Sequence, residues 1–310
     1  MNDEPAIPST PARIPPKATE ENPFLALWED FRQGKRAVFF LWVCGALLLA
    51  AILAPLISPQ NPYDLMQIDM FDARLAPGAP SSTSGMIYFL GTDGQGRDML
   101  SAMLYGLRTS LFVGVLSGVI AIAVGVALGL TAAYWGGVVD TVIMRVVDFM
   151  LGFPTILVAL MMLAVLGQGI DKVIVALVMV QWAYFARTVR GTALVERNKE
   201  YVEAAISLDL SHSRIVFSQL LPNCLPPVIV IGTMQVASAI SIEATLSFLG
   251  LGLPVTEPSL GLLISNGFNY LLSGLYWISV FPGILLLITI FSINIVGDRL
   301  RDVLNPRLRR

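Results

Sequence analysis

The sequence predicts an all-α, polytopic membrane protein with six transmembrane helices. Two features of the composition predict this fold, because 55% of the 310 residues are hydrophobic and only 14% are charged. A third is that long apolar stretches recur along the chain. Soluble domains carry roughly 25% charged residues, so the composition argues against a large soluble domain. The formal net charge of −2, without a concentrated basic face, argues against a nucleic-acid partner.

The N-terminal residues are expected to precede the membrane domain. Residues 1–22 are rich in proline, contain acidic residues and lack an apolar stretch, so they do not form a secretory signal. We expect them to be a disordered cytoplasmic tail. Residues 23–57 then supply an amphipathic leader and the first transmembrane helix, and residues 58–105 an extracytoplasmic loop.

Six apolar stretches account for the predicted spans. A helix needs about 20 residues to cross roughly 30 Å of hydrocarbon. Stretches 37–57, 110–134, 149–167, 225–250 and 275–297 satisfy this length. A sixth stretch, 173–186, is short and spans the bilayer if Lys172 and Arg187 reach the two surfaces. Stretch 110–134 carries glycines four residues apart, a spacing that favours close helix packing.

The positions of Lys and Arg predict the orientation. With the N-terminus in the cytoplasm and six crossings, all but four of the 20 basic residues lie on the cytoplasmic side. The four outside are Arg74, Arg97, Arg108 and Lys172. Cytoplasmic loops are enriched in basic residues, so both termini are expected in the cytoplasm. Residues 196–223, between the fourth and fifth spans, are then cytoplasmic too.

Residues 196–223 are the longest polar interruption between the later spans. Tyr201, Val202, Ala205 and Leu208 recur at helical spacing, which predicts an amphipathic helix that breaks at 209–211. Ser211 is a candidate N-cap for a second short helix, which Pro222 is expected to end. The residues alone also fit an amphipathic loop lying on the lipid surface.

Several residues in this interruption resemble the EAA motif of ABC importer permeases. They are the run Glu203-Ala204-Ala205, the pair Arg214-Ile215 and the run Leu221-Pro222-Asn223. The resemblance implies a helix that docks into a groove on a cytoplasmic ATPase. Glu203 would offer a charge-assisted hydrogen bond, and the two alanines would permit close approach. The residues expected to take part are Glu203, Ala204, Ala205, Asp209, Leu210, Ser211, His212, Ser213, Arg214 and Pro222.

One position departs from the family pattern. The family usually has glycine where this chain has Asp209. A helix stop there favours a left-handed backbone, for which glycine is best and Asn or Asp follow. Asp209 is therefore expected to keep the turn at modest cost.

Three longer stretches resemble permeases of the dipeptide, oligopeptide and nickel group, of the C type. They are Leu90–Gly114, Ala244–Ile264 and Phe281–Arg309. The resemblance implies a permease core at 106–298 that includes the coupling loop, and a cytoplasmic tail at 299–310. It also implies import of di- or oligopeptides by alternating access. Nickel, opines and oligosaccharides are the alternative substrates.

The resemblance further implies the partners and the location. They are a second, homologous permease, two ABC ATPases, an extracytoplasmic substrate-binding protein and the lipid of a bacterial inner membrane. The chain contains no GxxxxGK[ST] pattern for a nucleotide phosphate. ATP and Mg²⁺ are therefore expected on the partner ATPases, and no cofactor or metal on this chain. Cys44 and Cys224 lack metal-ligand spacing and are not expected to form a disulfide.

The intramembrane acid Glu243 is the remaining candidate site. Because an ionisable residue at this depth is costly, it either holds neighbouring helices together or lines a substrate path or gate with Met234 and Gln235. A rival interpretation is an intramembrane enzyme that uses Glu243 or Asp148 as an acid–base group, but neither has a nucleophile–base pair or a metal cluster nearby in the sequence. A channel or scaffold without energy coupling would not need the polar interruption.

Two further polar positions have local interpretations. His212 is expected either to contact the ATPase or to be solvated. Arg97 and Asp98 are expected to form a local ion pair or to contact a binding protein.

Overall fold

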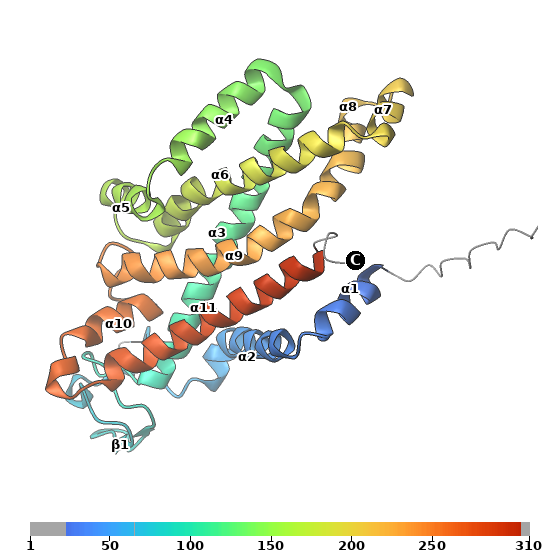
Figure 1. Cartoon of the computed structure of the whole chain (residues 1–310). Helices are drawn as coiled ribbons and strands as arrows, with labels where there is room; N and C mark the ends of the chain where they lie inside the picture. The colour runs from blue at the N-terminus through green and yellow to red at the C-terminus, as the bar shows by residue number, and fades with distance from the viewer. Residues whose placement is uncertain (1–22, 65, 305–310) are drawn as a thin grey trace, which may run out of the picture.

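The computed structural model describes residues 23–64 and 66–304, and its long elements are all helices (Figure 1). Within these residues, five helices are long and apolar enough to cross a membrane. They are α2 (Lys35–Ile57), α3 (Met99–Trp135), α6 (Ile170–Arg197), the run His212–Phe248 that includes α8 and α9, and α11 (Trp277–Leu304). A sixth span results if the bent pair α4 (Gly137–Leu151) and α5 (Thr155–Leu166) crosses as one. The predicted all-α fold is confirmed. The tail predicted at 1–22 and the last residues of the tail predicted at 299–310 lie outside the described residues.

The third predicted span is wrong in its shape. Instead of one helix over 149–167, α4 and α5 meet at an angle of 91°. The helix breaks before Pro154, which has no N–H for a helical bond and disfavours helical geometry in the residue before it. Residues 137–148, expected as a connection, belong to α4.

The fourth span is longer than the apolar stretch that predicted it. Helix α6 has 28 residues, and its polar end is held by ion pairs to α4. Arg187 pairs with Asp148 and Arg190 with both carboxylate oxygens of Asp140. Arg187 therefore has a protein partner, rather than merely reaching a lipid surface.

Helix α3 is the central helix of the bundle, and its glycines explain how closely its neighbours pack. A Cβ on Gly129 would lie 2.6 Å from the carbonyl oxygen of Ala186 in α6. A Cβ on Gly114 would lie 2.6 Å from Ile240 in α9. The small residues thus permit contacts that a methyl group would block, which confirms the predicted tight packing.

The segment before α3 folds into a small unit. It contains the 3-10 helix η1 (Met70–Asp72) and an antiparallel pair, β1 (Ala79–Pro80) and β2 (Ile87–Tyr88). The buried carboxylate of Asp72 accepts hydrogen bonds from the hydroxyls of Ser81 and Tyr88 and from Ser82. Burial opposes its ionisation, but these donors outweigh that cost and lower the pKa of Asp72 to about 2.

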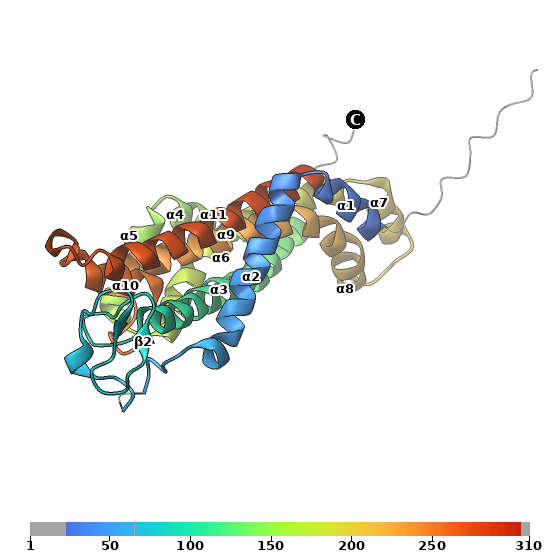
Figure 2. The same cartoon turned by 90° about the horizontal axis from the view of Figure 1, so that it is seen from below.

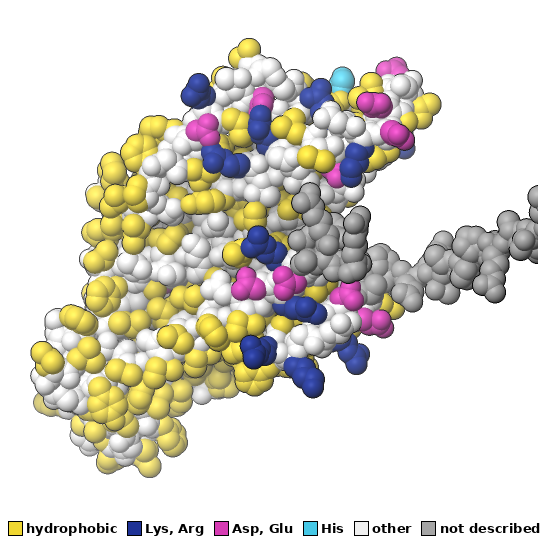
Figure 3. Space-filling model, in the orientation of Figure 1, with side chains coloured by type: hydrophobic (Ala, Val, Ile, Leu, Met, Phe, Trp, Pro, Cys, Tyr) yellow, Lys and Arg dark blue, Asp and Glu magenta, His cyan; other side chains and the backbone are white. Residues whose placement is uncertain are grey.

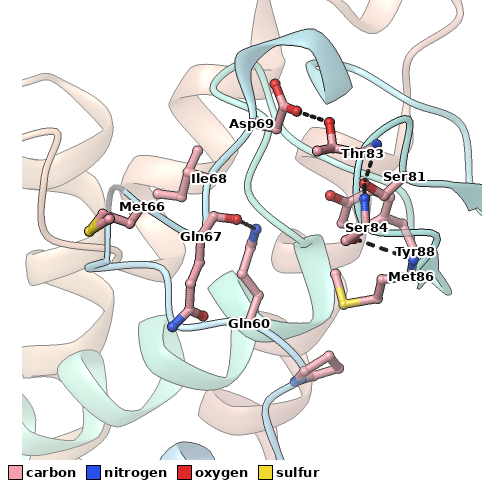
Figure 4. A pocket seen from close by; sticks show the side chains of 11 residues that line it. Gln60, Met66, Gln67, Ile68, Asp69, Ser81, Thr83, Ser84, Met86 and Tyr88 are labelled. Atoms are coloured by element: carbon pink, nitrogen blue, oxygen red, sulfur yellow. Dashed lines mark hydrogen bonds between the residues drawn. The ribbon is translucent and has the colours of Figure 1, made fainter.

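Two features complete this outer unit. Arg97 and Asp93 form an ion pair at 2.7 Å, with both side chains 1% exposed. Asp98, which the sequence suggested as the partner, instead caps α3 by accepting from the N–H of Ser101. A pocket of about 370 Å³ lies beside the hairpin (Figure 4). There Gln60 donates to the carbonyl of Gln67.

The remaining helices cover the ends of the bundle. Helix α10 (Leu260–Phe268) and the 3-10 helix η3 (Leu271–Ser273) connect α9 to α11. Helix α1 (Pro23–Arg32) packs against the far end of α11, where Arg299 donates to the backbone carbonyls of Asp30 and Phe31. Helix α11 continues to Leu304, so residues 299–304, expected in a tail, are helical.

Candidate coupling surface

Residues 200–220 form a compact projection at one end of the bundle (Figures 1 and 2). It consists of α7 (Glu200–Ser207), a short turn, α8 (His212–Arg214) and the π-helical turn η2 (Ile215–Leu220). Its inner side chains join a core cluster with α3 and α6. They are Val202, Ala205, Ile215, Val216 and Leu220. The projection is therefore anchored on the bundle and is not a loop lying free on the lipid.

The turn after α7 has the backbone that the sequence predicted. Asp209 has φ 54, in the left-handed region. The N–H of Leu210 bonds to the carbonyl of Ala205, and the N–H of Asp209 to that of Ile206. These two bonds are those of a Schellman motif, with Asp209 in the position usually taken by glycine. The expected role of Asp209 in the turn is confirmed.

The outward side of the projection combines polar and apolar groups. Glu203 and Ala204 are exposed, together with Ile206, Leu208 and Phe217. We call these five residues the coupling surface. Leu208 is 75% exposed, although the sequence placed it on the inner face. Neither Ile206 nor Phe217 was predicted from the sequence. The three-residue spacing from Glu203 to Ile206 is the signal that could have found Ile206.

The structure corrects the docking role predicted for Ala205 and the helix end predicted at Pro222. Ala205 is 5% exposed and belongs to the core cluster, so its small size serves packing within the chain. Pro222 does not end the second helix, because the helix runs on without interruption to Phe248. Pro222 lies in the first turn after the π-helical turn Ile215–Leu220, at the start of α9 (Leu221–Phe248), and the changed hydrogen-bond pattern of that turn accommodates a residue without an N–H.

The turn residues and α8 are mostly exposed beside the coupling surface. Ser211 occupies the N-cap position, but its side chain makes no capping bond. Leu210 is half-buried against the core cluster. The exposed polar residues are Asp209, Ser211, His212, Ser213 and Arg214.

His212 has a partner within the chain. Its Nδ1 is hydrogen-bonded to the hydroxyl of Tyr134 at the end of α3, and the two rings meet edge to face. The guanidinium of Arg197 lies 6.0 Å from the centre of the Tyr134 ring. His212 thus ties α8 to α3. Its contact with an ATPase stays a prediction.

A second polar network joins the base of the projection to α6 and α9. The hydroxyl of Tyr201 donates to Glu196 and accepts from Asn223, while Lys199 donates to the other oxygen of Glu196. Burial and the nearby Glu196 carboxylate raise the pKa of Tyr201 to about 12. Glu196 belongs to α6, Tyr201 to α7 and Asn223 to α9. The network therefore fixes the position of α7 relative to the two long helices.

The three residues predicted to line a substrate path or gate, Met234, Gln235 and Glu243, all lie in α9. Met234 lines a cavity of about 620 Å³ between α6, α9 and α11, with Glu196 and Arg301 among its other lining residues. The backbone carbonyl of Gln235 accepts from Gln181. Glu243 is completely buried and accepts from Ser110 of α3 and from Ser247, both at 2.8 Å. This geometry supports a structural role for Glu243, and its role at a gate stays a prediction.

Charged side chains gather at the end of the molecule that carries the projection, on the face shown in Figure 3. The opposite edge of the same view is largely hydrophobic. Within the described residues, no group of three His, Cys, Asp or Glu residues is placed to hold a metal ion. Asp148, the other acid considered for chemistry, is bound to Arg187.

Comparison with protein families and relatives gives concordant matches. Residues 125–310 match the family described as "Binding-protein-dependent transport system inner membrane component", and residues 22–77 match the "N-terminal TM domain of oligopeptide transport permease C". The dipeptide transport system permease protein DppC of Escherichia coli is 40% identical over 288 residues, covering 93% of this chain and 94% of the relative. The oligopeptide transport system permease protein OppC of Bacillus subtilis is 35% identical over 290 residues, covering 92% of each.

A solved structure supports the fold. One chain of the MetNI methionine ABC transporter, in an inward-facing conformation, has a TM-score of 0.53 and 22% sequence identity. The similarity covers 67% of this chain and 98% of that one. At this identity the likeness concerns the helical bundle alone.

Proposed function

Because the chain belongs to the family of binding-protein-dependent transport system inner membrane components, we propose that its coupling surface docks a partner ATPase and that the chain carries di- or oligopeptides. The protein is the permease subunit of a bacterial ABC importer and is not itself an enzyme. ATP is hydrolysed on partner ATPases. The intramembrane enzyme considered from the sequence is therefore set aside.

The observation that carries the docking proposal is the coupling surface itself. Ile206, Leu208 and Phe217 are large apolar side chains that are more than half exposed at the charged end of the molecule. Apolar groups surrounded by charged ones mark a protein interface. Docking there would bury them, with Glu203 in place for a hydrogen bond. Closure of two ATPases would favour one state of the bundle through contacts made in that state alone.

The subunit composition of the whole importer and the orientation of this chain are part of the same proposal. A second, homologous permease would complete the pathway, and two ATPases and an extracytoplasmic binding protein would join them. Both chain ends would lie in the cytoplasm with the coupling surface. The gathering of charged side chains at that end, with the ends of α1 and α11 nearby, supports this orientation. Residues 58–98 would then face outward.

The substrate class is proposed from the relatives. The relatives reported above carry dipeptide or oligopeptide transport in their names. Transport of a radiolabelled dipeptide by the reconstituted importer tests this proposal. Uptake of ⁶³Ni²⁺, an opine or a labelled oligosaccharide, with no uptake of the peptide, would assign the alternative substrate instead.

A matched pair of leucine substitutions tests the docking. Leu208→Glu places a charge at the most exposed of the three large apolar side chains of the coupling surface. We expect it to lower ATPase recovery with the tagged permease by about tenfold or more. Leu272→Glu makes the same change at a fully exposed leucine at the opposite end of the molecule. It should leave recovery unchanged. Equal ATPase recovery with both variants, measured by quantitative mass spectrometry, would contradict docking at this surface.

A further inference from the structure

Helix α2 crosses α3 on the outside of the bundle (Figure 2). A groove lies between the two helices beside this crossing. Its volume is about 650 Å³, within the roughly 300–1,000 Å³ of typical ligand pockets. The contact of Ala51 with Leu107 and Leu111 closes the crossing itself. The groove lies beside this crossing, and most of its lining is aliphatic.

The α3 wall of the groove is a single stripe of one helix face. Arg108, Phe112, Val115 and Val119 line it at helical spacing. From Arg108 to Val119 the helix rises about 16 Å, which is close to half of the roughly 30 Å hydrocarbon thickness of a bilayer. The apolar part, from Phe112 to Val119, accounts for about 10 Å of this rise, so it can hold the upper part of one acyl chain.

The opposite wall is equally apolar. Leu48 and Ile52 of α2 face the stripe and are 50% and 62% exposed. Phe112 and Val119 are 53% and 57% exposed. No side chain of the described residues covers these surfaces, so an apolar chain could lie against all four.

Arg108 is the charged end of the groove. It lies just before the predicted span 110–134, and Tyr63 lines the groove beside it. The Arg108 side chain is exposed, and within the described part of the chain it forms no ion pair within 4 Å. Arg108 and Glu257 both act electrostatically on the Tyr63 hydroxyl, so this end of the groove is polar and Arg108 keeps its donors free for a further anion. A guanidinium at the edge of the hydrocarbon needs an anion, and its planar donors match phosphate oxygens.

We propose that this groove is a binding site for one glycerophospholipid molecule. The phosphate lies on Arg108, the Tyr63 side chain borders the headgroup, and one acyl chain follows the stripe from Phe112 to Val119. Basic pockets between transmembrane helices bind lipid headgroups on the cytoplasmic side of membranes, and Arg108 would offer the same chemistry on the opposite side. The site requires no particular transported substrate. In the proposed orientation the lipid comes from the extracytoplasmic leaflet.

Photolabelling of the assembled importer in nanodiscs tests the site. The probe is phosphatidylglycerol with a diazirine near the middle of one acyl chain, and the labelled peptide is identified by mass spectrometry. We expect the label on residues 112–119 of α3. Unlabelled phosphatidylglycerol should compete with it, whereas a diacylglycerol of the same chains, which lacks phosphate, should not. Equal competition by the two lipids would overturn the role of phosphate.

Arginine variants separate the site from general lipid contact. Arg108→Gln should lower labelling of residues 112–119 by about tenfold, because a charge-assisted hydrogen bond is lost, and Arg108→Lys should retain part of it. Arg145→Gln, at an exposed arginine of α4, should leave labelling unchanged. Each variant is compared only after the complete importer is recovered.

Two results would overturn the proposal. One is equal labelling of residues 112–119 in Arg108→Gln and Arg145→Gln. The other is cross-linking of this stripe to the second permease in place of lipid, which would assign the groove to a subunit interface. Both measurements are independent of peptide uptake, so failure of the substrate proposal would not imitate either result.

Discussion

Asp209 shows how a single backbone angle shapes the coupling surface. Its left-handed conformation turns the chain from α7 to α8. We expect Asp209→Gly to be tolerated, since glycine adopts this angle freely. Asp209→Val should destabilise the turn by about 1–2 kcal/mol, because a β-branched residue is strained there.

The measurement is ATP hydrolysis coupled to transport in the reconstituted importer. Asp209→Val should lower the ratio of transport to hydrolysis, while Asp209→Gly keeps it. Equal coupling in the two variants would show that the turn conformation does not determine docking.

Substitutions at Glu243 should show whether its carboxylate has a structural role. Its carboxylate accepts from two serine hydroxyls in a completely buried setting. Glu243→Gln keeps an acceptor and a similar shape, so assembly and transport should persist. Glu243→Leu leaves the two hydroxyls without their acceptor and should cost about 1–3 kcal/mol for each unsatisfied group.

Thermal unfolding of the purified importer and peptide uptake distinguish the two roles of Glu243. A fall in Tm for Glu243→Leu with normal behaviour of Glu243→Gln supports the structural role. Loss of uptake in Glu243→Gln at unchanged Tm would instead favour the gate.

At the scale of elements, the outer unit depends on the ionisation of Asp72. Its folded pKa of about 2 lies below the ordinary value of 3.8. The ionised carboxylate therefore stabilises the unit fully above about pH 4, and this contribution is lost as the pH falls toward 2. The protection of residues 69–92 against amide hydrogen exchange in nanodiscs, measured relative to the intrinsic exchange rate at each pH, should therefore fall over this pH window.

The variant Asp72→Asn provides the control. It should exchange faster at neutral pH and lose the change between pH 4 and pH 2. An unchanged pH profile in this variant would assign the acid sensitivity to another group.

The sequence predicted whole apolar helices better than it predicted polar contacts between them. The glycines of α3 and the Asp209 turn followed from local rules, because spacing and backbone preference carry that information. The bend at Pro154 was missed although proline is a local signal for a helix break. The contacts of α4 were missed for a different reason, because Arg187 and Arg190 find Asp148 and Asp140 only after the chain folds. Ala205 was misplaced for the same reason: a sequence does not say which side of a short helix the bundle covers.

At the scale of the whole molecule, the proposed orientation predicts which surfaces reagents reach. With Cys44 and Cys224 replaced by alanine, His212→Cys should react with a membrane-impermeant maleimide only after the cytoplasmic side is opened. Ser84→Cys, exposed in the outer unit, should react in intact spheroplasts. The reverse pattern would invert the topology and remove the coupling surface from the ATPase side.

The helix that begins beside the coupling surface does not stop at the membrane. The run His212–Phe248 has 37 residues, or about 55 Å of helix, and ends just beyond the buried Glu243. One continuous helix therefore links the projection to the level of Glu243. Its irregular features, the π-helical turn Ile215–Leu220 and the prolines at 226 and 227, lie near the end that an ATPase would drive. We therefore expect any bending of this helix to occur before residue 228, and residues 228–248 to move as one unit.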